Sequence, residues 1–333
     1  MVPLHNQTLA DIDIDDHKIL AAAAKLKSSS TAGPDGIPSV VLKKCITELL
    51  TPLRLHFGSS LSSGTFPALW KMAYMFAVHK NGDRKNIHNY RGISSLCAVS
   101  KLFELVVMDP VFSFCKCLIS ENQHGFLPGR STTTNLLTFT EDVTESMVKH
   151  LQTDAIYTDL SASFDKLNHA IAIAKLDRMG LHGNLLRWFQ SYLTGRTLCV
   201  KIGEFISNLF EVFSGIAQGS HLGPLVFLFY FNDSNYALQA PRLSYADDMK
   251  IYCEVKTLDE ARFLQRQLDV FADWCATNRM VLNPQKCSVI SFTRKKKPIV
   301  FDYHLSGAVV ARQNCVKDLG FYCSTLVSTS IST

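Results

Sequence analysis

The chain has 333 residues, of which 47% are hydrophobic and 19% are charged, with a formal net charge of +5. This length exceeds the usual size of one domain, so we expect one core with a lobe, or two packed subdomains. The mild positive charge is compatible with binding a polyanion but does not predict it alone. Ten scattered cysteines without zinc-site spacing are typical of a reduced, intracellular protein. The longest apolar run, Pro224 to Phe231, is too short to cross a bilayer, so no membrane partner is expected.

The first predicted elements are helices followed by a strand. A helix is expected over residues 15–27, and apolar residues return at helical spacing over 40–61 after a Ser-rich break and a Gly/Pro turn. The apolar centre of residues 70–80 predicts a buried strand. Residues 94–119 predict one or two helices interrupted at Pro110.

The second half of the chain alternates predicted strands with predicted helices. A helix over 132–151 leads to a short apolar strand at 155–159, and helical spacing follows from 164 to 174. Another helix near 185–193, a hairpin, an apolar helix after Gly-Pro and a helix near 258–278 complete the pattern. This order favours an α+β architecture over a doubly wound sheet.

The stretch SYADDMKIY at 244–252 places two carboxylates inside a strand pattern. Alternating apolar residues from Met249 to Val255 predict a half-buried strand, and Asp247 and Asp248 are then expected at a hairpin tip. Adjacent Asp residues repel each other and disfavour strands, so the stretch costs stability unless a turn and a cation accommodate it. Taken alone, the pair is more often a solvated turn.

A second strand supplies another carboxylate. The segment TDLSASFD places Asp159 at the end of a strand and Asp165 in the following helix. If this strand lies beside the hairpin, Asp159, Asp247 and Asp248 converge. Mg²⁺, with Mn²⁺ as the alternative ion, relieves such repulsion, and two ions roughly 3.5–4 Å apart suit phosphoryl transfer.

Nine motifs in order resemble the reverse transcriptase of non-LTR, LINE-type retrotransposons, particularly Jockey-like elements. They are AGPDGIP (32–38), FPALWKMA (66–73), NYRGISSLCAVSKLFE (89–104), NQHGFLPGRSTTTNLL (122–137), TDLSASFDKLNH (158–169), AQGSHLGPLVF (217–227), YADDMKIY (245–252), WCATNRMVLNPQKC (274–287) and VKDLG (316–320). YADD alone is a weak signal, whereas the ordered set is specific. The resemblance implies an α+β, right-hand polymerase fold with fingers and palm and a truncated or absent thumb.

The resemblance also implies roles for single residues. Asp159, Asp247 and Asp248 would be metal ligands, with the carbonyl of Leu160 completing the set. The ring of Phe164 would exclude a 2′-OH and so select deoxynucleotides; its alternative role is a core aromatic.

Further residues would contact the substrates. Gln218 and Gly219 would form a loop beside the template and incoming nucleotide, where glycine permits close backbone approach. Lys80 and Arg91 would hold the triphosphate, unless they are solvated surface charges. Lys286 would protonate the departing pyrophosphate as a general acid.

Three positions depart from the family pattern. Ala217 replaces a proline and is expected to loosen the Gln-Gly loop, and His221 replaces a small apolar residue. Ser163 replaces an alanine, at an expected cost of ~1–3 kcal/mol if its hydroxyl is buried without a partner. None of these changes removes a catalytic group.

The resemblance predicts the domain order and the function. Residues 1–55 would be an N-terminal extension, 56–154 fingers with part of the palm, 155–300 the palm, and 301–333 the start of a connection to a truncated thumb. The expected function is RNA-directed DNA polymerase, with an RNA template, a DNA primer and deoxynucleoside triphosphates as partners, and with nuclear action. The alternatives are a catalytically silent, truncated nucleic-acid-binding remnant, or a related palm enzyme such as an intron maturase or a nucleotide cyclase. A cyclase needs neither fingers nor a Gln-Gly loop.

Overall fold

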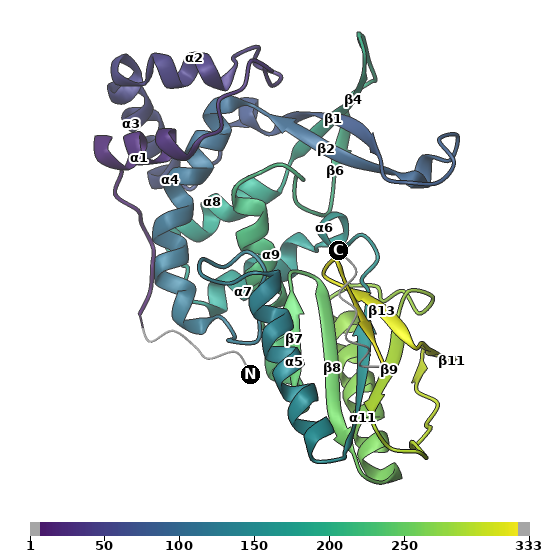
Figure 1. Cartoon of the computed structure of the whole chain (residues 1–333). Helices are drawn as coiled ribbons and strands as arrows, with labels where there is room; N and C mark the ends of the chain where they lie inside the picture. The colour runs from purple at the N-terminus through teal and green to yellow at the C-terminus, as the bar shows by residue number, and fades with distance from the viewer. Residues whose placement is uncertain (1–6, 326–333) are drawn as a thin grey trace. The chain divides into compact units, whose positions relative to one another are not determined.

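The computed structural model describes residues 7–325, which form two compact units (Figure 1). Unit 1 contains residues 119–163 and the chain from 231 onward, and unit 2 contains the chain up to residue 118 and residues 164–230. The last part of the predicted thumb connection, residues 326–333, lies outside the described residues. Among the helices of the described chain, none is both long and apolar enough to span a membrane.

The centre of unit 1 is a five-stranded sheet in the order β12-β9-β3-β8-β7 (Figure 1). Strand β3 is antiparallel to both β8 and β9, and β7 and β8 form an antiparallel hairpin. The strands of this sheet are β3 (Gln152–Thr158), β7 (Arg242–Tyr245), β8 (Asp248–Val255), β9 (Ser288–Thr293) and β12 (Ala311–Arg312).

Helices cover both faces of this sheet. Helix α5 (Thr132–Val148) packs its Phe139 against Tyr252 of β8, whereas α11 (Leu258–Thr277) lies against the face that carries Cys253. Strand β8 is therefore buried on both sides, and the expectation of a half-buried strand is wrong, because a strand in the middle of a covered sheet has no solvent face. The other elements of unit 1 are α10 (Ser234–Ala237), β10 (His304–Leu305), β11 (Ala308–Val309), β13 (Cys315–Asp318) and β14 (Phe321–Ser324).

Both long helices of unit 1 begin with capping boxes. The side chain of Ser131 accepts a hydrogen bond from the backbone of Thr134, whose own side chain accepts one from Ser131. Thr257 and Glu260 make the same reciprocal arrangement before α11. Such boxes satisfy backbone amide groups that would otherwise lack partners, so these residues determine where the two helices begin.

The sheet of unit 2 has the order β2-β1-β4-β5, with β6 also paired to β4. Strand β1 is antiparallel to β2 and parallel to β4. A buried β1 was expected, but only Ala73 of this strand is fully buried, and the strand becomes exposed toward its end at Ala77 and Val78. The strands are β1 (Met72–His79), β2 (Tyr90–Leu96), β4 (Arg196–Ile202), β5 (Phe205–Ile206) and β6 (Phe210–Val212).

The helices of unit 2 differ from expectation at three places. Helix α4 runs through Pro110 without interruption, because buried residues on both sides, such as Val107 and Val111, outweigh the lost backbone bond. The expected helix over 40–61 is divided at Cys45, and the one over 164–174 is divided at Asn168, whose side chain caps the second part. The helices are α1 (Asp16–Lys25), α2 (Ser39–Lys44), α3 (Ile46–Ser63), α4 (Ala98–Cys115), α6 (Ser163–Lys166, beginning at the last residue of unit 1), α7 (His169–Arg178), α8 (Gly183–Leu193) and α9 (Leu222–Asn232, ending in unit 1), with short 3₁₀ turns at η1 (Ala68–Trp70), η2 (Ile87–Asn89) and η3 (Lys116–Leu118).

Candidate active site

The predicted hairpin with the two carboxylates is present in unit 1. Tyr245 pairs with Asp248, so Ala246 and Asp247 form a two-residue turn and Asp248 is the first residue of β8. Ala246 has a left-handed backbone with φ of 58°. Two-residue hairpin turns require such conformations, which cost an alanine about 1–2 kcal/mol. Other contacts must therefore hold this turn in place.

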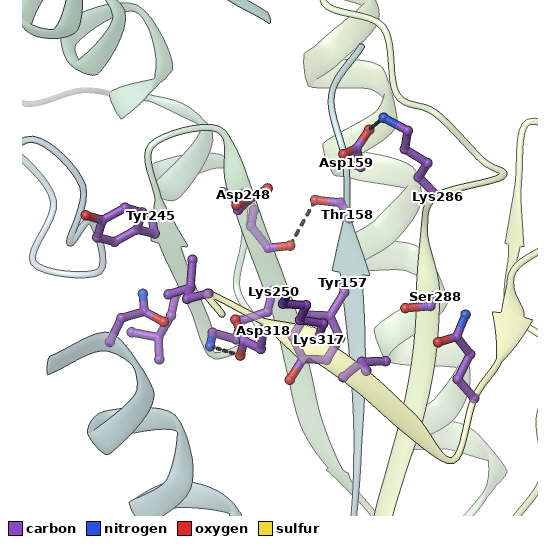
Figure 2. Close-up of a pocket in the computed structure, with 16 residues that line it drawn as sticks. Tyr157, Thr158, Asp159, Tyr245, Asp248, Lys250, Lys286, Ser288, Lys317 and Asp318 are labelled. Atoms are coloured by element: carbon purple, nitrogen blue, oxygen red, sulfur yellow. Dashed lines mark hydrogen bonds and ion pairs between the residues drawn. The ribbon is translucent and has the colours of Figure 1, made fainter. Parts of the chain in front are cut away.

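The strand that ends at Asp159 lies directly beside the hairpin. Thr158 pairs with Met249, so one further step along each strand brings Asp159 opposite Asp248. Both line a pocket of about 260 Å³, together with Lys286. Figure 2 shows the two carboxylates at the ends of neighbouring strands, with Lys286 reaching Asp159. The Nζ of Lys286 is 3.4 Å from Oδ2 of Asp159, and its side chain is 65% exposed.

The loop that carries Lys286 also holds the backbone around Asp159. Leu160 forms a β-bridge with Leu282, and the amide of Asn283 donates to the carbonyl of Asp159 at 2.9 Å. Leu160 itself is buried. The end of β3 is thus fixed on both sides, by β8 and by the segment that leads to Lys286.

Two carboxylates, Asp154 on β3 and Asp159 directly after it, have opposite environments. Asp154 is fully buried and accepts hydrogen bonds from Gln152, Ser291 and Tyr303. Asp159 has a buried Oδ2 that accepts no hydrogen bond from the described chain. A buried oxygen without a donor is costly unless something outside the chain satisfies it. Asp154 is therefore structural, whereas Oδ2 of Asp159 has only the 3.4 Å ion pair with the exposed Lys286.

The third carboxylate, Asp247, contacts a residue on another segment of unit 1. The Oγ of Ser163 donates to Oδ2 of Asp247 at 2.5 Å, and Ser163 is buried. The hydroxyl is paired, so the cost expected for an unpaired hydroxyl at this position does not arise. The serine that departs from the family pattern thus touches the candidate site directly.

The negatively charged carboxylates at this edge repel one another. The pKa of Asp248 is raised to about 6, first because the surrounding protein displaces part of the water around its otherwise exposed carboxylate, and second because Asp247 and Asp159 are negatively charged. Lys250 opposes this rise. The positive charge at the edge therefore falls short of what three carboxylates need.

The chemistry of these residues suits a hard divalent cation. All three side chains offer carboxylate oxygens, the ligands that Mg²⁺ prefers, and Oδ2 of Asp159 accepts no hydrogen bond from the described chain, its ion-pair partner Lys286 lying 3.4 Å away. Among residues 7–325, no group of three or more His, Cys, Asp or Glu side chains is already arranged to hold a metal. Oδ2 of Asp247 accepts the hydrogen bond from Ser163, and Asp247 is not among the residues that line the pocket shared by Asp159 and Asp248.

The predicted Gln-Gly loop lies in unit 2 and is held by several hydrogen bonds. The side-chain Nε2 of Gln218 donates to Oδ1 of Asp165 at 2.8 Å, and the amide of Ser94 donates to the carbonyl of Gln218 at 2.7 Å. Gly219 has φ of 123°, and a Cβ there would lie 2.5 Å from the carbonyl oxygen of Ser94. Glycine is thus required by the approach of strand β2, within the protein itself.

A buried glutamate supports the same loop. The Oε2 of Glu104 accepts hydrogen bonds from the backbone amides of His221 and Leu222, at 2.6 and 3.3 Å. Burial raises the pKa of Glu104, and the positive charge of Arg196 opposes that rise. The expected loosening at Ala217 is opposed by these bonds and by Ser220, whose hydroxyl donates to the carbonyl of Ala217.

The remaining predicted residues of unit 2 are spread over two places. The ring of Phe164 stacks on Phe227 at 4.5 Å between centroids, which fits the packing role that was weighed for it. Lys80 and Arg91 are both exposed on the β1–β2 hairpin. Arg91 pairs with Val78, and Lys80 directly follows the last residue of β1, so both lie at the end of the hairpin near its connecting loop.

The chain belongs to the reverse transcriptase (RNA-dependent DNA polymerase) family, which matches residues 78–323. Three relatives from Drosophila melanogaster agree with this assignment. The chain is 28% identical to the probable RNA-directed DNA polymerase from transposon BS over 91% of its own length, and 25% identical both to that from mobile element jockey over 94% and to the probable one from transposon X-element over 91%. It spans about a third of each relative, 35% of the first two and 34% of the third. The resemblance to Jockey-like retrotransposon enzymes is confirmed.

Sequence reasoning assigned no role to several residues that shape the two regions. Gln123 contacts the Ala246 turn, Glu104 and Asp165 hold the Gln218 loop, and Ser163 contacts Asp247. Each lies inside a quoted motif, which was the available signal, but each partner is 50 or more residues away in the chain. Local patterns carry no information about such pairs.

Proposed function

We propose that this chain is the polymerase part of a non-LTR retrotransposon reverse transcriptase, which extends a DNA primer on an RNA template with deoxynucleoside triphosphates. The observation that carries this proposal is the pair Asp159 and Asp248 on neighbouring strands, lining one pocket, in a chain of the reverse transcriptase family. The named relatives are RNA-directed DNA polymerases of mobile elements, which supports the same activity here.

The units have natural counterparts in a right-hand polymerase. The sheet of unit 1, with its carboxylate edge, is proposed as the centre of the palm, and the β1–β2 hairpin of unit 2 as part of the fingers. The domain ranges predicted above remain proposals, including 301–333 as the beginning of a thumb connection.

The carboxylates would hold Mg²⁺, or Mn²⁺ in its place. Asp159, Asp247 and Asp248 would supply side-chain oxygens, and Leu160 would supply its carbonyl. A pair of bound ions would stabilise charge on the attacking and departing oxygens of the phosphoryl transfer. The turn and strand β3 would keep these oxygens together, so less reorganisation is needed when substrate binds.

The other predicted residues would act on the substrates. Lys80 and Arg91, both exposed near the end of the β1–β2 hairpin, would bind the triphosphate, and Phe164 would exclude a 2′-OH. Gln218 and Gly219 would present a shaped loop to the template and nucleotide.

Lys286 is proposed as the general acid for the departing pyrophosphate. Its exposed ammonium group beside Asp159 is free to move toward a phosphate. A Lys286→Ala protein should lose the alkaline limb of the pH–rate profile, and an unchanged profile would remove this role.

The decisive experiment is primer extension on poly(rA)/oligo(dT) with Mg²⁺ or Mn²⁺. The control is the double variant Asp247→Ala/Asp248→Ala, checked for folding by circular dichroism. We expect metal-dependent synthesis that the control lacks. Synthesis that survives in the control would remove the proposed site.

A catalytically silent nucleic-acid-binding protein is the second candidate. It is favoured by one observation, that no three-ligand group is preassembled among the described residues. Titration with Mn²⁺ separates the two functions, because a polymerase must bind the ion whereas a silent protein binds RNA without it. Folded protein that binds RNA but neither binds Mn²⁺ nor extends a primer would establish the silent function.

A further inference from the structure

Gln123 is a buried amide that contacts the carboxylate turn. It is 1% exposed, and its Oε1 accepts from the backbone amides of Gly125 at 2.7 Å and Ala246 at 3.0 Å. Its Nε2 donates to the carbonyl of Ala246 at 3.2 Å. One side chain therefore binds both backbone groups of the left-handed residue that precedes Asp247.

The neighbours of Gln123 reinforce this contact. The backbone of His124 donates to the carbonyl of Ser244 at 2.8 Å, and the amide of Ser244 donates to the carbonyl of Asn122 at 2.9 Å. Gly125 packs so closely on the backbone of Ala246 that a Cβ would overlap it. Residues 122–125 thus extend along the outer side of β7 and end at the turn.

We infer that Gln123 is a positioning residue for the carboxylate site: its amide holds Ala246 in the left-handed conformation that aims Asp247 and Asp248 at their ligand. An amide suits this task because it offers an acceptor to an N–H and a donor to a C=O at once. A carboxylate cannot donate when ionised, and an apolar side chain offers neither group. The expected effect on metal binding rests on the proposed function. The hydrogen bonds between the Gln123 side chain and the backbone of Ala246, called the clamp below, need no metal.

The chain offers a matched control. Gln267 is also a buried glutamine, and its Oε1 accepts from the backbone amides of Gln239 at 2.6 Å and Ala240 at 3.2 Å. These residues precede β7 at the end away from the carboxylate turn. Gln267→Met therefore removes comparable backbone bonds in the same unit without touching Ala246.

The test compares Gln123→Met with Gln267→Met in the full chain. Mn²⁺ affinity is measured by electron paramagnetic resonance on folded protein, and thermal unfolding is measured alongside. Partners that orient metal ligands typically contribute roughly 10–100-fold to affinity, so we expect a loss of this size for Gln123→Met and less than about twofold for Gln267→Met. Equal losses at equal destabilisation, or no loss for Gln123→Met, would overturn the proposal.

Two further measurements separate the clamp from the metal function. Hydrogen exchange without metal should become faster over residues 244–249 in Gln123→Met, and faster around 239–240 in Gln267→Met. If the wild-type chain binds no Mn²⁺, the proposed function fails, and exchange alone decides the clamp. In an Ala246→Gly background, where the left-handed conformation carries no Cβ penalty, the effect of Gln123→Met on exchange over 244–249 should shrink. An undiminished effect there would argue against the backbone role.

Discussion

The carboxylate edge of unit 1 and the Gln218 loop of unit 2 carry most of the predicted site residues, but they are built in opposite ways. At the carboxylate edge, desolvation and then like charges raise the pKa of Asp248, and Oδ2 of Asp159 accepts no hydrogen bond and has only the exposed Lys286 beside it. In the Gln218 loop, the polar groups are bonded within the protein, to Asp165, Ser94 and neighbouring residues. The first region keeps charge that the described chain does not fully satisfy, whereas the polar groups of the second are bonded within the protein.

This difference predicts that the two regions have different roles in the proposed reaction. A region with unsatisfied charge gains most when its ligand arrives, so its residues should control whether reaction occurs. A region that is already rigid provides shape, so its residues should control how well the nucleotide is held. The following predictions test this division.

The largest effect is expected at the carboxylate edge. Asp159→Asn keeps the shape of the side chain but removes a charge from the metal site. Loss of several kcal/mol of charge stabilisation corresponds to at least about 10³-fold in the rate of metal-dependent primer extension. Gln218→Ala, in the other region, should reduce the rate by only about tenfold. Similar losses in the two variants would contradict the proposed division.

A second effect concerns the support of the same edge. The ammonium of Lys250 is 2.5 Å from Asp318 of β13, and both side chains are buried, at 4% and 6% exposure. Asp318→Asn leaves the lysine charge buried without a counterion and should destabilise the protein by about 3–5 kcal/mol. Chemical denaturation measures this loss. Adding Lys250→Met should recover most of it, and a double variant no better than the single one would mean that the pair is not coupled.

The third prediction belongs to the Gln218 loop. Asp165→Ala removes the acceptor that orients the amide of Gln218, so KM for the deoxynucleotide should rise about 3–10-fold with little change in kcat. Asp165→Asn keeps an acceptor oxygen and should behave nearly as wild type. Steady-state kinetics on a homopolymer template separates the two constants. A fall in kcat that the asparagine variant does not restore would place Asp165 in another role.

Local sequence predicted some features of the fold and the site, whereas others depend on contacts between distant residues. Apolar periodicity and loop residues predicted the β7–β8 hairpin, the end of β3 and the starts of α5 and α11, because those signals act over a few residues. Burial of β8 on both faces and the intact helix at Pro110 depend on which segments pack against them. The partners of Gln123 and Glu104 are more than 100 residues away, so a single sequence offered only the motifs in which they lie.

The smallest expected effect is a change in the pH dependence of stability when Asp248 is replaced. The pKa of Asp248 in the folded protein is about 6, above its ordinary value of 3.8. A carboxyl group with a raised pKa contributes stability that is fully present below pH 3.8 and is lost as pH rises through 6, because the folded state disfavours the ionised form. Asp248→Asn should therefore stabilise the metal-free protein at pH 7.5, and the gain should disappear toward pH 4. We expect about 1 kcal/mol, less than the full shift implies, because the side chain is exposed and solvent screens its charge.

Urea denaturation of the metal-free variant and wild type across this pH range checks the sign. Added Mg²⁺ should make the wild type more stable than Asp248→Asn at pH 7.5, because the ion stabilises only the protein that keeps its full set of carboxylates. A variant that is less stable than wild type without metal would show that the edge is satisfied within the chain. The contrast with the Gln218 loop would then disappear, and with it the reason to regard the carboxylate edge as a cation site.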